Sequence, residues 1–138
     1  MEVDTLMLAD GAQAVGGKVY ILGGGWNTVW ARTFPAEHKL SVAVGLRIGW
    51  NETHFRHKFA LEVQTLARSA VQQLAAGEFE AGKPAGMKEG ADQSFMIAIE
   101  GMLKLETEAE LQLAVIMNGE QLKAIPFRIV KVAIPPLG

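Results

Sequence analysis

The clearest feature of the sequence is a strict alternation of apolar and polar residues in two neighbouring segments. The alternate positions that predict an inward face are Leu40, Val42, Val44, Leu46 and Ile48 in the first segment, and Phe55, His57, Phe59, Leu61 and Val63 in the second. Because successive side chains of a β-strand point to opposite faces, each segment is predicted to lay one face on a core and the other in water. Residues 49–53 between them are rich in turn formers, so we expect an antiparallel pair of strands.

Shorter apolar segments predict further strands along the chain. They are residues 3–9, 18–22, 26–32, 95–99, 111–117 and 125–130. Asp10 and Gly11 are expected to end the first of them. Asn118 and Gly119 follow the strand at 111–117, and both tolerate positive φ, which favours a tight hairpin. Pro126 has no amide hydrogen, so it is expected at the start of a strand or on a sheet edge.

Two segments are less regular. Residues 66–76 are rich in helix formers, with Leu66, Ala70 and Leu74 spaced four apart, which allows one short helix. The neighbouring pattern is β throughout, so short strands near 71–74 and 78–80 are the slightly favoured alternative. The glycines, Pro84 and mixed charges of residues 82–92 predict a loop.

These elements predict an all-β fold, namely an immunoglobulin-like antiparallel β-sandwich of about seven to nine strands. The 138 residues suit a single sandwich domain over residues 1–138. Residues 3–9 and 111–117 are apolar on both faces, whereas a strand of a simple sandwich exposes one face. Because a subunit interface is the economical cover for those second faces, we predict a homodimer or a larger homo-oligomer.

Composition narrows the classes of partner. The chain has no cysteine, which excludes thiol nucleophiles and thiolate metal sites and favours a reducing compartment, so a cytoplasmic location is expected. A formal charge of −2 gives no overall attraction to nucleic acid. No segment approaches the roughly 18 apolar residues of a membrane span, so we expect no contact with a membrane.

The histidines and glycines are the first candidates for chemistry. His54 and His57 are three apart and therefore face opposite sides of a strand, which argues against shared metal binding, also with His38. The triple glycine 23–25 lacks the following residues of a phosphate-binding loop and is expected to be a bulge or a crossing between sheets. No catalytic residue, metal site or cofactor is predicted.

The tryptophans are the candidate surface residues. Trp26 and Trp30 share a face if they lie on one strand, and Trp50 lies in a turn. Such side chains either stack on a ligand or partner or fill the core, and the core is the more frequent place for a large aromatic. Trp26, Trp30 and Trp50 are thus the candidate ligand- or partner-binding residues.

The N-terminal third also resembles a known family. Asp4, Asp10 and above all the segment 17–25, GKVYILGGG, are similar to the opening of a family of uncharacterised bacterial and phage proteins of similar length, and residues 126–130 resemble that family's closing strand. The resemblance implies an immunoglobulin-like sandwich with no assigned activity.

Three functions remain open on this basis. The first is a noncatalytic interaction module that works by protein–protein contact with an unknown protein or with itself. The second is a sandwich that binds a small ligand or carbohydrate through Trp26, Trp30 or Trp50. An enzyme with a metal or carboxylate site is a remote third.

Overall fold

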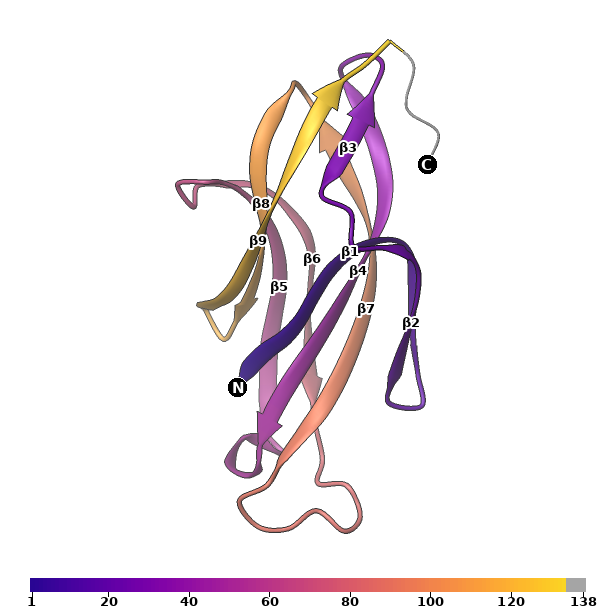
Figure 1. Cartoon of the computed structure of the whole chain (residues 1–138). Helices are drawn as coiled ribbons and strands as arrows, with labels where there is room; N and C mark the ends of the chain where they lie inside the picture. Colours follow the sequence, from indigo (N-terminus) through magenta and orange to yellow (C-terminus); the bar gives the residue numbers. More distant parts are fainter. Residues whose placement is uncertain (134–138) are drawn as a thin grey trace.

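The computed structural model describes residues 1–133, and these fold into two β-sheets packed face to face (Figure 1). The strands are β1 (Glu2–Val15), β2 (Lys18–Gly24), β3 (Thr28–Ala31), β4 (Ala36–Gly49), β5 (Arg56–Thr65), β6 (Ala70–Glu80), β7 (Asp92–Leu105), β8 (Ala109–Met117) and β9 (Glu120–Lys131). A 3₁₀ turn, Trp50–Glu52, precedes β5. The all-β sandwich prediction is confirmed, and the segment that allowed a short helix at 66–76 instead contributes to β6.

Sheet A has the strand order β2-β1-β4-β7, and sheet B has the order β3-β9-β8-β5-β6. Every neighbouring pair is antiparallel except β3 and β9, which run parallel. The predicted pairing of residues 40–48 with 55–63 is wrong, because β4 pairs with β1 and β7 while β5 pairs with β6 and β8. The turn after β4 therefore carries the chain across from sheet A to sheet B.

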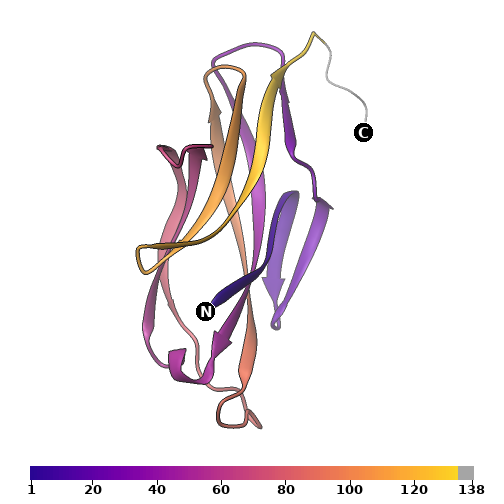
Figure 2. The same ribbon diagram turned by 60° about the vertical axis from the view of Figure 1, so that its left-hand side comes forward.

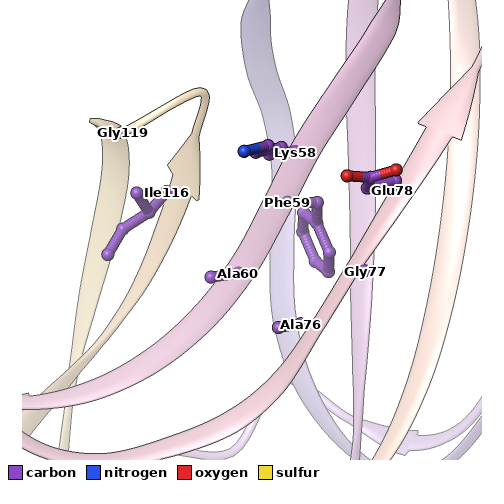
Figure 3. Close-up of a pocket in the computed structure, with 8 residues that line it drawn as sticks. All are labelled: Lys58, Phe59, Ala60, Ala76, Gly77, Glu78, Ile116 and Gly119. Carbon is purple, nitrogen blue, oxygen red and sulfur yellow. The ribbon is translucent and has the colours of Figure 1, made fainter.

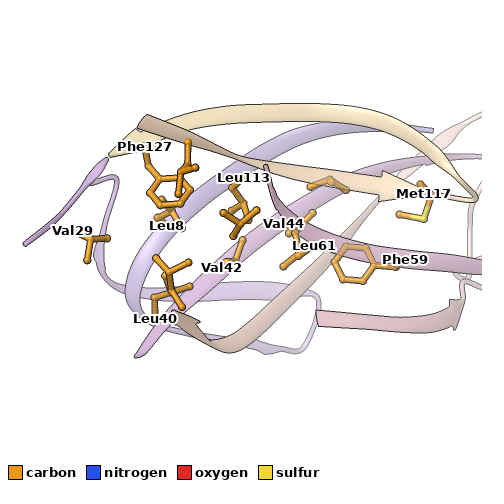
Figure 4. Close-up of a cluster of buried hydrophobic side chains, with 14 of the residues drawn as sticks. Leu8, Val29, Leu40, Val42, Val44, Phe59, Leu61, Leu113, Met117 and Phe127 are labelled. Carbon is orange, nitrogen blue, oxygen red and sulfur yellow. The ribbon is translucent and has the colours of Figure 1, made fainter. Parts of the chain in front are cut away.

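The core lies between the sheets, where the two predicted apolar stripes meet (Figure 4). The five alternating positions of β4 are all buried, and so are His57, Phe59, Leu61 and Val63 of β5. Leu113 and Phe127 reach the same cluster from β8 and β9. Phe55 is an exception to the predicted stripe, since it precedes β5 and is 62% exposed.

β1 does not end at Asp10 and Gly11 as predicted. Its first part pairs with β4 up to Ala9, and its second part pairs with β2 from Ala9 to Val15. β1 and β2 also contact β7. Strands two places apart in a sheet are about 9.6 Å apart, so these contacts arise where β1 has left β4. The hairpin of residues 10–24, called the arm below, lies on the side of sheet A away from sheet B (Figures 1 and 2).

The second faces of β1 and β8 are covered in part within the chain. Ala9 is paired with Ser41 and faces away from the core, as does Ala43 in β4, and both alanines are 0% exposed. Ala114 of β8 also faces outward, opposite Glu62, and is 0% exposed. Met7 and Ile116 on the same two faces are only half-buried, so the chain covers these faces at their alanines but not completely at their larger side chains.

The turn predictions can be compared with the backbone. The triple glycine 23–25 connects β2 of sheet A to β3 of sheet B, with positive φ at Gly23 and Gly25, so the predicted crossing between sheets is confirmed. Asn118 and Gly119 have φ values of 53° and 83° and close the β8–β9 hairpin as predicted. Pro126 lies inside β9, but β3 pairs only from Arg128 onward, so one side of β9 is free of a strand there.

Candidate functional site

The structure separates the three candidate tryptophans. Trp26 lies between β2 and β3, packs partly against the core and meets His38 edge-on, with ring centroids 6.0 Å apart. Its buried Nε1 has no hydrogen-bond partner among the described residues. Trp50 lies in the 3₁₀ turn under Lys83, whose Nζ is 3.9 Å from the ring centroid. Trp30, on β3, is 41% exposed and is therefore the tryptophan best placed to meet a ligand.

The histidines occupy separate environments. Burial lowers the pKa of His38 below 6.5, although the charge of Asp10 acts to raise it. His57 is buried, and its Nδ1 lies 3.1 Å from the Asn118 amide nitrogen, so its Nε2 donates to the Glu52 carbonyl. The Asn118 oxygen accepts the Lys58 amide, which fixes that orientation. His54 is exposed, but it lies in the turn before β5 with a φ of 62°, so its exposure does not arise from alternation along one strand as predicted.

The described residues contain no group of three or more His, Asp or Glu side chains placed to hold a metal ion. Asp4 and Asp10 lie on the same strand but have different neighbours. Asp4 is 4.0 Å from Arg47, and Asp10 packs against Gly23. Over residues 1–133, no helix is long and apolar enough to cross a membrane.

The outer face of sheet B is the first surface that could meet a partner. A chain of side-chain hydrogen bonds crosses its middle: Gln112 donates to Gln64, and Gln64 donates to Gln121 and Glu62, over 2.8–3.0 Å. Gln64 is buried by this network. These hydrogen bonds pair polar side chains on the outward faces of β5, β8 and β9 with one another.

A shallow depression lies at one end of that face (Figure 3). It has a volume of about 420 Å³ and lies where β5, β6 and the β8–β9 hairpin meet. Ala60, Ala76 and Ile116 give it an apolar floor, while Lys58 and Glu78 face each other across β5 and β6 at its rim. Arg56 donates to Glu78 over 3.3 Å, so this carboxylate at the rim is paired with a cation.

A second depression lies toward the other end of sheet B, near β3. It has a volume of about 320 Å³ and is lined by Asn27, Leu66, Glu110, Leu111, Pro126, Phe127 and Arg128. Arg128 Nε donates to the Thr28 hydroxyl over 3.2 Å, and that hydroxyl donates to the Asn27 side chain over 3.0 Å. The residues come from two strands, β8 and β9, and from the loops that hold Asn27 and Leu66. Sequence reasoning missed them because it could not tell which loops lie beside these strands.

The arm offers the third surface. Val19 and Ile21 are half-buried, whereas Tyr20 and Leu22 are 59% and 76% exposed. A further depression of about 480 Å³ lies between residues 11–13 and 20–22. The sequence indicated this surface only through the uninterrupted apolar run of residues 19–22, which is apolar on both faces like residues 3–9 and 111–117.

Comparison with known proteins gives a family but no activity. The model of a family of unknown function, DUF6941, matches residues 4–130. A search of curated proteins finds no match. Among solved structures, the Pseudomonas fluorescens alkylpurine DNA glycosylase AlkC bound to DNA containing an abasic site analog is 11% identical, over 90% of this chain and 30% of that chain, with a TM-score of 0.31. On the match over residues 4–130, the chain belongs to the DUF6941 family of unknown function.

Proposed function

We propose that the protein is a noncatalytic β-sandwich module that acts by protein–protein contact, and that this contact is β2 of the arm paired with β2 of a second copy. The observation that carries the proposal is the free edge of β2. This seven-residue strand pairs with β1 on one side and with no described strand on the other. Such an edge presents unpaired N–H and C=O groups, which another extended strand satisfies.

The other sheet edges are less available. β7 is an edge strand of sheet A and β6 is an edge strand of sheet B, and the two edges lie against each other. The side-chain amide of Gln72 in β6 donates to the Met102 carbonyl over 2.7 Å and accepts a hydrogen bond from the Lys104 backbone N–H over 3.0 Å. Leu74 packs at Gly101, where an added Cβ would come within 3.1 Å of its Cδ2. β3 is the fourth edge and has only four residues. β2 is therefore the long edge that remains open.

The composition of β2 also supports pairing. Sheet edges are normally protected from association by charges, prolines or bulges. Between Lys18 and Gly23 there is no charged residue and no proline, and the register of β2 with β1 runs without a shift from Val15–Lys18 to Gly11–Leu22. In Figure 2 the second strand of the arm lies farther from the body of the sandwich than the first.

The register of a symmetric pair follows from the hairpin. Gly16 and Gly17 form its two-residue turn, so Val15 and Lys18 should make the first hydrogen-bonded pair. Alternation then directs the peptide groups of Val19 and Ile21 to the free edge. A two-fold axis at Tyr20 places Val19 opposite Ile21 of the second copy and Lys18 opposite Leu22, so no like charges meet.

The size of this contact predicts a weak dimer. Five residues of antiparallel strand are about 17 Å long, and even with the flanking side chains such a contact falls short of the roughly 1,200 Å² of a stable interface. We therefore expect dimers that dissociate on dilution rather than a permanent oligomer. We also infer a cytoplasmic setting, which the cysteine-free sequence supports.

Sedimentation velocity over about 5–500 µM tests the proposal, because weak contacts populate the dimer only at the upper end. The weight-average mass should rise above the 14.9 kDa monomer as concentration increases. Tyr20→Lys should abolish the rise, since it places two lysines opposite each other across the axis. Phe55→Lys, a change at another exposed aromatic, should leave it intact. A monomer at every concentration, or an equal effect of both variants, would contradict the proposal.

A further inference from the structure

We propose that the outer face of sheet B at β3 binds a neutral saccharide, with Trp30 stacking on a sugar ring and Asn27, Glu110 and Arg128 bonding its hydroxyls. This site lies on the other sheet from the β2 edge and does not depend on the proposed dimer. The site uses Trp30. Of the three candidate tryptophans, Trp26 packs against the core and Trp50 lies under Lys83, whereas Trp30 is exposed in the part of the chain that the structure describes.

Trp30 points to the same face of sheet B as the depression, although it does not line it and lies beside Val130, on the other side of Arg128 from Pro126. Val29 and Ala31 of β3 are buried, so Thr28 and Trp30 between them point outward. In register, Thr28 lies beside Arg128 and Arg128 lies beside Glu110, which makes a row across β3, β9 and β8. Trp30 is two residues farther along β3, about 7 Å from that row. A flat ligand on the indole therefore reaches the polar row.

The donors of the row are held in place before a ligand arrives. Arg128 Nε donates to Thr28, which in turn donates to Asn27 Oδ1. The Asn27 carbonyl accepts the Arg128 amide over 2.9 Å, which fixes the loop to the strand. Among the described residues, no side-chain hydrogen bond or ion pair joins the terminal nitrogens of Arg128, so they are free to bond a ligand.

Charge selects the class of ligand. Glu110 and Arg128 lie opposite each other on β8 and β9, yet no ion pair joins them among the described residues. The row therefore has one positive and one negative group, and its net charge is zero. A polyanion needs several cations, and this row has only one. Hydroxyl groups both donate and accept, so a polyhydroxylated neutral molecule satisfies the arginine, the carboxylate and the amide together.

Shape and aromatic chemistry agree with this class. The depression of about 320 Å³ lies at the lower end of the roughly 300–1,000 Å³ range of small-ligand sites. Leu66 and Pro126 give it apolar walls. The C–H groups on one face of a pyranose ring carry partial positive charge, and the face of an indole ring is negative, so the two attract when stacked.

The test is a titration followed by the tryptophan indole signals in two-dimensional ¹H–¹⁵N NMR. The probes are cellohexaose, maltohexaose and chitohexaose, each up to about 10 mM, which detects dissociation constants near 1 mM. We expect at least one of them to shift the Trp30 indole signal saturably. Trp30→Ala should weaken binding at least tenfold when the backbone amides of Arg128 and Glu110 report it, and Trp30→Tyr should lose less.

Matched variants separate binding from folding. Glu110→Gln and Arg128→Gln should each weaken binding several-fold without changing the thermal melt, because both side chains are exposed. Phe55→Ala removes an exposed aromatic elsewhere and should not affect binding. The inference is overturned if none of the three hexasaccharides gives a saturable shift, if Trp30→Ala binds as the parent does, or if a heparin hexasaccharide binds at these residues and the neutral sugars do not.

Discussion

At the scale of single residues, Gly23 accounts for the bend between the arm and the sandwich. Gly23 has a φ of +59°, and an added Cβ would collide with the Asp10 side chain. Gly17 in the arm turn has a φ of +76°, but nothing lies within 4 Å of its added Cβ. An alanine at Gly17 would therefore introduce backbone strain alone, whereas an alanine at Gly23 would introduce the same strain and a collision with Asp10.

Gly17→Ala should cost about 1–2 kcal/mol of unfolding free energy, the ordinary penalty of left-handed backbone for a residue with a Cβ. Gly23→Ala should cost more, about 2–3 kcal/mol, because the collision adds to the same strain. Urea denaturation measures both. Adding Asp10→Ala to Gly23→Ala should recover part of the loss, and equal costs for the two glycines would show that Asp10 does not constrain the bend.

The burial of His38 predicts a pH dependence of stability. Since burial lowers its pKa in the folded state, although Asp10 opposes this shift, the unfolded chain binds the proton more readily just below pH 6.5. Stability from this residue is therefore present above the unfolded value of 6.5 and is lost as pH falls from there toward the lower folded pKa. Thermal melts from about pH 7.5 to 5.5 should show a steeper decline for the parent than for His38→Gln. Parallel declines would contradict the assignment.

Residue-scale features were the most predictable from sequence. The two-residue period correctly identified the buried positions of β4 and placed His57 inside. It failed at Phe55 because His54 adopts a φ of 62°, which interrupts the alternation just before β5 begins. The alternation of faces requires continuous extended backbone, and no pattern in residues 49–55 indicated the left-handed conformation of His54.

At the scale of elements, the two-residue alternation predicts which face of a strand is buried but not which strands pair with it. β4 and β5 have matching apolar stripes because they face each other across the core, and the same stripes would suit a hairpin. The length of β1 was missed for a related reason, since Asp10 and Gly11 bend the strand without ending its pairing. The candidate surfaces depended on these neighbours, so only Trp30 among their residues was identified in advance.

The contact between β6 and β7 gives a prediction at this scale. Gln72→Ala should destabilise the fold by about 1–2 kcal/mol, because it removes two hydrogen bonds to the backbone of β7 in a partly solvated place. Gln73→Ala, the exposed neighbour, should change stability by less than about 0.5 kcal/mol. Chemical denaturation of the two variants provides the comparison. Equal effects would mean that the glutamine bridge does not hold the sheets' edges together.

At the scale of the whole molecule, the proposed surfaces lie on different parts of the sandwich. The β2 edge belongs to the arm beside sheet A, and the Trp30 face belongs to sheet B. The second faces of β1 and β8 are partly buried within the chain, which weakens the argument for a large interface through them. The dimer that we propose forms through what the arm exposes. This makes the register of β2 the central claim.

Disulfide crosslinking measures that register directly, because the chain has no cysteine of its own. With a two-fold axis at Tyr20, the two Tyr20 residues form a non-hydrogen-bonded pair about 4.5 Å apart at Cα, within the span of a disulfide. Leu22 instead faces Lys18 of the second copy, and the two Leu22 residues are about 13 Å apart. The account predicts that Tyr20→Cys oxidises readily to a covalent dimer while Leu22→Cys does not. Equal crosslinking of both variants, or none of Tyr20→Cys, would contradict it.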